Sequence, residues 1–164
     1  MNQKTSHDSE TPAEGQQVIT TCAFIWHDFS GVKKVFMPRR AETKKFLPNV
    51  YELPGGHIDF GEEIILGLKR EINEEFEMNI EVGEPFFVFT YINEVKKSHS
   101  IEVIYLAQFM DNIEKIKIEP GDHSGYAWIA ENEMEKVFTP GKGMDDPEMQ
   151  AVKKGFEIIN QKTQ

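Results

Sequence analysis

The chain has 164 residues, 39% hydrophobic and 28% charged, which is the size and composition of one globular domain. Its formal net charge of −10 disfavours nonspecific nucleic-acid binding, which needs a basic surface, so nucleic acid is an unlikely partner. A phosphate-bearing substrate stays open, because metal ions screen the repulsion. The sequence has no apolar run of about 18 residues, so no transmembrane helix is expected.

The N-terminal residues 1–16 are polar and lack the apolar core of a signal peptide. We interpret them as a disordered tail that precedes a single domain at residues 17–161. One cysteine, Cys22, excludes an internal disulfide, so a reducing cytoplasm is the expected location. Cys22 lies in an apolar run, which favours a small buried strand residue over a nucleophile.

Before the long helix, the pattern predicts a β-hairpin followed by a loop. The expected elements are a buried strand at 18–26, a turn at 28–31, its partner strand at 32–38, a basic polar loop at 39–48, and a short strand at 50–53. Pro54-Gly55-Gly56 should end that last strand in a tight turn, where the backbone can approach a ligand closely.

A helix is predicted over residues 62–76, with apolar residues at helical spacing on one face. That face consists of Ile64, Ile65, Leu68, Ile72 and Phe76. Asp59 is the expected N-cap, because Glu62 follows it at the spacing of a capping box.

The second half should contain strands at 80–82, 85–92, 101–110 and 126–129, and a brief helix at 130–137. Asp146 and Pro147 mark the start of the last helix as its N-cap and first residue. Because hairpins and helices alternate without a regular βαβ repeat, the pattern favours an α/β fold with a mixed sheet packed between helices.

Four of the eight residues in REINEEFE, residues 70–77, are glutamates. Glu71, Glu74 and Glu75 stand at i, i+3 and i+4, so they share one helix face although like charges repel there. A solvated acidic face, with Arg70 paired to Glu74, would explain the pattern. The alternative is a site for a hard divalent cation such as Mg²⁺, which prefers oxygen ligands and leaves room for phosphate and water.

The residues before the helix favour the second interpretation. From Gly56 the chain reads GHIDFGEEIILGLKREINEEFEM, and this segment resembles the Nudix box of the Nudix hydrolase superfamily (MutT-like). YELPGGHID resembles the strand and turn that usually precede the box, and DHSGYAWIAENEM resembles the family's later acidic, His and Trp segment. One fixed position differs, because Glu77 stands where the family usually has glycine.

This resemblance implies a Nudix-type α/β/α sandwich and hydrolysis of a diphosphate linked to another moiety, with Mg²⁺ or Mn²⁺ as cofactor. The metal-binding carboxylates would then be Glu71, Glu74 and Glu75. Gly56 would contribute its carbonyl as a further metal ligand. Arg70 would orient Glu74.

Glu62 would support the site by pairing with Arg70. Family members differ in their general base, and Glu71 and Glu74 are both candidates. Asp122 stands where many members place a further acidic residue that binds metal or accepts a proton, with Glu119 as the second choice.

Glycine at the end of such a helix often adopts the left-handed conformation, which is unfavourable for Glu77. Asn79 tolerates that region better. We therefore expect the helix to continue to Asn79 without moving the carboxylates.

The loop before the box is unusually basic for an acidic chain. Arg39 and Arg40 are candidates for binding the substrate phosphates, with Lys44 and Lys45 as looser contacts. Phe87, Phe89 and Tyr91 should share one face of a strand, where they either stack on a base or, more simply, pack in the core.

The leading hypothesis is thus a Mg²⁺-dependent pyrophosphohydrolase of a small nucleoside diphosphate derivative. A nucleotide-sensing module without catalysis is the alternative. An isopentenyl-diphosphate isomerase, which shares the fold and needs a cysteine, is a weaker one. The resemblance also allows for a homodimer, because many relatives pair.

Overall fold

The computed structural model describes residues 10–161. The strands are β1 (Gln17–Phe29), β2 (Val32–Arg40), β3 (Gly55–His57), β4 (Ile80–Asn93), β5 (Ser98–Phe109) and β6 (His123–Ala130). The α-helices are α1 (Ile64–Phe76) and α2 (Pro147–Gln161), and the 3-10 helices are η1 (Ile113–Lys115) and η2 (Glu131–Val137).

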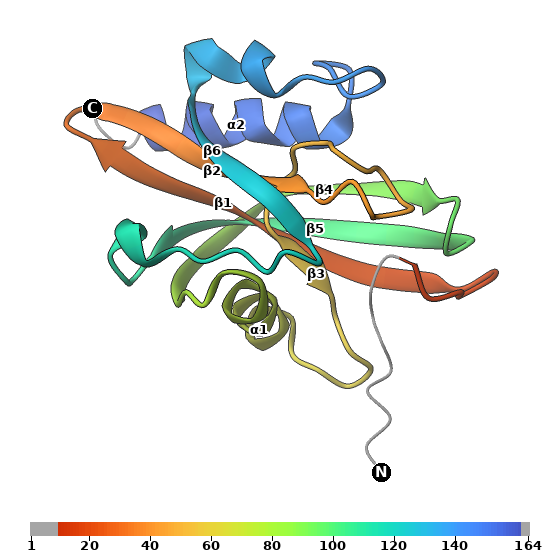
Figure 1. The fold of residues 1–164 in the computed structure, drawn as a ribbon. Helices are drawn as coiled ribbons and strands as arrows, with labels where there is room; N and C mark the ends of the chain where they lie inside the picture. The colour runs from red at the N-terminus through yellow and green to blue at the C-terminus, as the bar shows by residue number, and fades with distance from the viewer. Residues whose placement is uncertain (1–9, 162–164) are drawn as a thin grey trace.

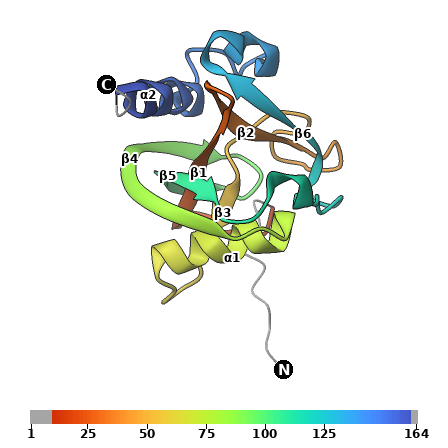
Figure 2. The same cartoon turned by 90° about the vertical axis from the view of Figure 1, so that its left-hand side faces the viewer.

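A mixed sheet forms the middle layer of the molecule. Its strand order is β4-β5-β1-β2-β6, with β3 paired to β1. Strands β1 and β5 run parallel, whereas the other pairs are antiparallel. Helix α1 covers one face and α2 covers the other (Figure 1, Figure 2). The predicted α/β/α sandwich with a mixed sheet between helices is therefore confirmed.

Alternating side chains of the central strands build one apolar core on each face of this sheet. Phe24 of β1 belongs to the core under α2 and packs edge-on against Phe156, with ring centroids 5.3 Å apart. Phe36 of β2 belongs to the core over α1 and packs edge-on against Phe76 at 5.2 Å. Both helices are held on the sheet by these aromatic contacts.

The hairpin was predicted correctly, but the segment after the basic loop was not. Residues 50–53 form no strand beyond a single bridge between Tyr51 and Arg39. The expected tight turn is instead β3, which pairs with Thr21 and its neighbours in β1. A Cβ on Gly55 would lie 2.0 Å from the carbonyl oxygen of Thr21, so the glycine permits close strand contact.

The predicted break between residues 82 and 85 is also wrong. Strand β4 runs continuously from Ile80 to Asn93 along β5, and its register shifts on either side of Pro85. Such irregularities bend an antiparallel strand without ending its pairing, and Pro85 itself stays opposite Tyr105.

Helix α1 begins later than expected. Its N-cap is Glu63, whose carboxylate accepts a hydrogen bond from the Leu66 amide at 2.9 Å. Asp59 is not the cap, although its amide donates to Glu62 Oε2 at 2.9 Å. The Glu62 carboxylate also accepts a hydrogen bond from Arg70 Nε at 2.8 Å, and the residues between Asp59 and Glu63 form a loop before the helix.

The predicted extension of this helix to Asn79 is wrong. Glu77 adopts the left-handed conformation, with φ of 52° and ψ of 34°, and its amide donates to the Asn73 carbonyl at 2.9 Å. The next residue, Met78, is fully buried, and the Asn79 amide donates to Asp111 at 2.9 Å. Burial of Met78 in the core thus outweighs the unfavourable backbone conformation of Glu77.

The C-terminal part agrees with the prediction in outline. The expected short helix is the 3-10 helix η2, and strands β5 and β6 extend several residues further towards the N-terminus than expected. Helix α2 begins at Pro147, and Asp146 Oδ1 accepts hydrogen bonds from the amides of Glu148 and Met149, as an N-cap should.

Part of the predicted tail, residues 1–9, lies outside the described residues. Within the described part, the Ala13 amide donates to the Lys96 carbonyl at 2.9 Å. The domain boundary at residue 17 stays a prediction. Neither α-helix within residues 10–161 has the length and apolar character needed to cross a membrane.

We expect Glu77→Gly to increase the free energy of unfolding by up to about 1 kcal/mol, because glycine adopts the left-handed region without steric cost. The lost contact between Glu77 and Lys117 is exposed and contributes little. Urea denaturation measures the change. Glu77→Ala is the control, since it removes the same carboxylate but keeps Cβ, and a glycine variant no more stable than the alanine variant would contradict the interpretation.

Candidate active site

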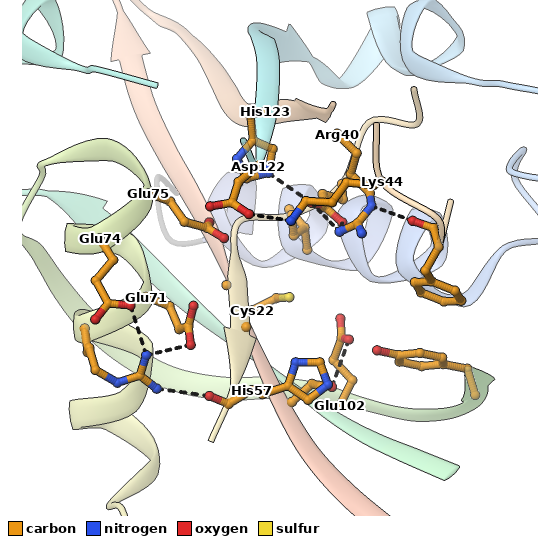
Figure 3. Close-up of a pocket in the computed structure, with 18 of the residues that line it drawn as sticks. Cys22, Arg40, Lys44, His57, Glu71, Glu74, Glu75, Glu102, Asp122 and His123 are labelled. Carbon is orange, nitrogen blue, oxygen red and sulfur yellow. Dashed lines mark hydrogen bonds and ion pairs between the residues drawn. The ribbon is translucent and has the colours of Figure 1, made fainter. Parts of the chain in front are cut away.

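A cavity of about 460 Å³ opens between the sheet and the acidic face of α1. Figure 3 shows the glutamates of α1 at one end, and Glu102 at the other. Its lining includes Gly56 of β3, the three predicted metal-binding glutamates of α1, Arg70, Arg40 and Asp122. The fold thus brings together nearly all residues that the sequence nominated.

Arg70 is the centre of the acidic end. Its Nε and Nη2 donate to both oxygens of Glu62, at 2.8 and 2.9 Å. Its Nη1 donates to Glu71 at 2.7 Å and to Glu74 at 3.3 Å, and its Nη2 also donates to the His57 carbonyl at 3.1 Å. One guanidinium therefore ties α1 to the loop before it and to β3, a forked geometry that lysine does not offer.

Glu71 and Glu75 are held in the wall of the cavity. A Cβ on Gly56 would lie 2.4 Å from the Glu71 carboxyl carbon, so a larger residue there would displace the Glu71 carboxylate from its present position. Burial raises the pKa of Glu71. Burial, followed by the charges of Glu52 and Glu71, raises the pKa of Glu75 well above its usual range.

The Glu75 carboxylate has a feature that a cation would explain. Its Oε2 is buried and has no hydrogen-bond partner among the described residues. Burying a carboxylate oxygen without a partner is unfavourable. Glu74, by contrast, is half exposed at the cavity mouth, with one oxygen on Arg70. This donor set of carboxylates beside a glycine carbonyl fits a hard divalent cation.

Asp122 lies just before β6, and Figure 3 shows its carboxylate beside Glu75. Its Oδ1 accepts a hydrogen bond from Lys44 at 2.5 Å, and its charge contributes to the raised pKa of Glu75. Lys44 also lines the cavity. The second choice for this role, Glu119, does not line it.

The two arginines of the basic loop are placed differently. Arg40 lines the cavity, and its Nη1 donates to both oxygens of Glu52, at 3.3 and 3.2 Å. Arg39 is exposed, does not line the cavity, and donates from Nε to the Asn49 carbonyl at 3.2 Å. The structure thus brings Arg40, but not Arg39, to the site.

Glu52 is a charged residue inside the wall that sequence reasoning missed. Besides Arg40, it contacts the buried His123, whose Nε2 lies 3.0 Å from Glu52 Oε1. Burial alone would raise the pKa of Glu52, but the Arg40 charge and the His123 hydrogen bond lower it to about 2. The carboxylate therefore stays ionised and fixes both partners.

The floor of the cavity also contains buried polar groups that the sequence analysis did not nominate. Glu102 of β5 accepts a hydrogen bond from the Thr20 hydroxyl at 3.1 Å. Behind the floor, close to Glu102 but not lining the cavity, Glu148 of α2 accepts a hydrogen bond from the Leu53 amide at 2.7 Å and pairs with the buried Lys142.

Two sequence signals could have identified these residues. Glu102 has the same strand parity as Ile104 and Leu106, which places a carboxylate on the core face of the strand. Glu148 follows the helix-initiating proline on the buried side of α2.

Cys22 also lies at this floor and is buried, as predicted for a strand residue. Burial, followed by the charge of Glu102, raises the pKa of the thiol well above its ordinary value. The cysteine is therefore a neutral thiol, which is a poor nucleophile.

The lowered pKa of Glu52 predicts a pH-dependent contribution to stability. That contribution is present above the unfolded-state pKa of about 4.5 and is lost as pH falls towards 2. We expect Glu52→Gln to lower the free energy of unfolding by roughly 1–3 kcal/mol at pH 7 and by less at pH 3. Denaturant titrations at several pH values measure this. An equal loss at both pH values would contradict an ionic origin.

Comparison with known proteins identifies the family. A model of the NUDIX domain matches residues 18–148. The m7GpppN-mRNA hydrolase NUDT17 of Xenopus laevis is 42% identical over 43 residues, which are 26% of this chain and 14% of that protein. Its Homo sapiens counterpart is 38% identical over 55 residues, or 34% of this chain and 17% of that protein. The chain thus spans less than a fifth of either relative.

Solved structures share the fold over most of their length. The MutT NUDIX hydrolase from Burkholderia pseudomallei has a TM-score of 0.63 and 23% identity, covering 77% of this chain and 93% of that one. A C. elegans Ap4A hydrolase in a binary complex has a TM-score of 0.68 and 19% identity, covering 88% and 98%. Because the family model spans most of the described residues, the chain belongs to the NUDIX domain family.

Proposed function

We propose that this protein hydrolyses a diphosphate bond in a nucleoside diphosphate linked to another moiety, with Mg²⁺ or Mn²⁺ as cofactor. The observation that carries the proposal is the acidic end of the cavity. There Arg70 holds Glu71 and Glu74 beside Gly56, and the Glu75 carboxylate buries an oxygen that has no hydrogen-bond partner in the described chain.

Glu71, Glu74, Glu75 and the Gly56 carbonyl are the residues that would hold the metal. When bound, such an ion screens phosphate charge and lowers the pKa of water, which makes water a nucleophile towards phosphorus. Arg70 keeps Glu71 and Glu74 oriented, and Glu62 in turn fixes Arg70 through two hydrogen bonds. The protein's own contribution is thus a preorganised acidic wall.

Cations on the other walls would receive the phosphates. Lys44 lines the cavity, and within residues 10–161 its ammonium forms an ion pair with Asp122 alone. A substrate phosphate could replace Asp122 there, and the released carboxylate could then accept a proton from water or bind metal. Arg40 also lines the cavity, where its Nη1 donates to Glu52 and its Nε donates to the Phe46 carbonyl at 3.0 Å, so it contributes a fixed positive charge there.

The names of the matched proteins support a nucleotide substrate. They describe an Ap4A hydrolase and m7GpppN-mRNA hydrolases. Another structural neighbour, the NUDIX domain of Shewanella oneidensis NrtR, was solved with ADP ribose. A nucleoside joined through phosphates to a second group is common to these compounds, and it is the substrate class proposed here.

The first test is product release from a panel of nucleoside diphosphate compounds, with Mg²⁺, with chelator, and with Glu74→Gln. We expect turnover of one class of compound, abolished by chelator. Glu74→Gln should lower kcat/KM by about a hundredfold or more, because a metal ligand contributes several kcal/mol to transition-state stabilisation. Mg²⁺-dependent nucleotide binding without any turnover would reject hydrolysis in favour of nucleotide sensing.

A second test concerns the positioning role of Arg70. We expect Arg70→Gln to lower the apparent affinity for activating Mg²⁺ and to reduce kcat by about 10–100-fold, because the glutamates lose their common partner. The dependence of rate on Mg²⁺ concentration separates this effect from a loss of folded protein. Lys69→Gln is the matched control, because Lys69 is adjacent to Arg70 on the same helix but its side chain is exposed. Equal effects of both variants would argue against the role of Arg70.

A further inference from the structure

The end of the cavity opposite the glutamates contains a carboxylate that the proposed chemistry does not use. Glu102 is only 6% exposed, yet it lines the cavity. Its Oε2 accepts a hydrogen bond from the Thr20 hydroxyl at 3.1 Å, and the carboxylate also accepts one from the Cys22 thiol. Within residues 10–161, no lysine, arginine or histidine forms an ion pair with it, and Lys142 pairs with Glu148 instead. A buried carboxylate without an ionic partner has capacity to accept further hydrogen bonds.

Two aromatic rings line the cavity near Glu102, since Tyr91 hydrogen-bonds Thr20, the partner of Glu102, and Phe46 stacks on Tyr91. Phe46, from the loop after β2, and Tyr91, from β4, both line it. Their ring planes are within 14° of parallel, and their centroids lie 6.0 Å apart. Phe87 and Phe89 of the same strand pack against the core instead. Aromatic rings at a cavity wall offer stacking surfaces for a flat heterocycle.

We infer that Glu102, Phe46 and Tyr91 form the base subsite, and that it selects guanine through the two adjacent N–H donors on its edge. This inference rests on the proposed function for the nucleotide, and it adds which base the nucleotide carries. Figure 3 shows Glu102 and the glutamates of α1 at opposite ends of the labelled cavity. A nucleotide bound along it would place its phosphates near the metal-binding residues and its base near Glu102.

The hydrogen-bonding capacity of Glu102 favours guanine over adenine. An ionised carboxylate only accepts hydrogen bonds, and guanine presents a ring N–H and an amino group side by side. Hypoxanthine retains the ring N–H but lacks the amino group. Adenine presents a ring nitrogen that is itself an acceptor, so it would face the carboxylate unfavourably. A buried polar group left unmatched makes such discrimination large.

The protonation state sets the conditions of the test. Burial, followed by the charge of Glu148, raises the pKa of Glu102 to about 7. At pH 8.5 the side chain is therefore mostly ionised and accepts hydrogen bonds only.

The experiment is an NMR titration of the full chain with GMP, IMP and AMP at pH 8.5 in the presence of Mg²⁺. We expect GMP to bind about 10–100-fold more tightly than AMP, with IMP between them, as a good bidentate contact provides. Equal dissociation constants for the three nucleotides in the wild-type protein would by themselves overturn the inference.

Variants assign the selectivity to its residues. Glu102→Gln should bring the ratio of AMP to GMP dissociation constants close to one, because the amide replaces one acceptor with a donor. Glu81→Gln is the matched control, since it makes the same change at an exposed position of β4, and it should keep the ratio. A Glu102→Gln protein that retains the wild-type ratio would overturn the role of Glu102.

Phe46→Ala tests the stacking surface separately, on a half-exposed loop residue. It should weaken all three nucleotides by a similar factor of about 5–100, because stacking does not read the base edge. Unchanged binding of all three would remove Phe46 from the subsite.

Monophosphates contain no anhydride bond, so these titrations do not depend on hydrolysis. Selective GMP binding by a protein that hydrolyses nothing in the substrate panel would support the base subsite and contradict the proposed activity. Hydrolysis of several compounds at equal efficiency, together with equal binding of the three monophosphates, would support the proposed activity and contradict the base subsite.

Discussion

The structure of the site depends on the guanidinium of Arg70. It connects the loop residue Glu62, the helix residues Glu71 and Glu74, and the carbonyl of His57 in β3. Without this guanidinium, the carboxylates of Glu62, Glu71 and Glu74 would face one another uncompensated. With it, one positive charge offsets part of their mutual repulsion, and the hydrogen bonds fix the orientation of α1 relative to β3. The same contact thus stabilises the fold and organises the acidic wall.

The opposite wall uses buried charge in a similar way. Glu52 joins Arg40 to His123, and Glu148 joins the Leu53 amide to Lys142. Because breaking a buried pair leaves an uncompensated charge, these contacts constrain the loop around residue 53, which leads directly into β3. The first turn of α2 therefore helps to position the strand that carries Gly56.

The cavity consequently has two ends with different chemistry. Carboxylates and the glycine carbonyl gather at the α1 end, where a hard cation and phosphates would be bound. Stacking rings and one buried carboxylate, Glu102, form the other end. Separation of the reacting group from the recognition group allows the base to be selected by residues that take no part in the chemistry.

The sequence by itself determined the long helix, its apolar face, the last helix and the family resemblance, because these depend on local spacing along the chain. The i, i+3 and i+4 positions of Glu71, Glu74 and Glu75 place them on one face in any helix. The resemblance to the Nudix box implied that these carboxylates gather near Gly56, and Glu71 does lie against that glycine. Asp146 and Pro147 likewise mark a helix start through their own local geometry.

Only the tertiary structure decided the helix end, β3 and the floor of the cavity. Glu77 adopts a left-handed conformation that its own preferences oppose, because Met78 must be buried in the core. Gly55 enters a strand rather than a turn because it lies against β1. Glu52 and Glu102 become site residues through partners far away in the sequence, His123 and Thr20. Contacts of this kind arise from strand pairing and packing, which a local residue pattern does not encode.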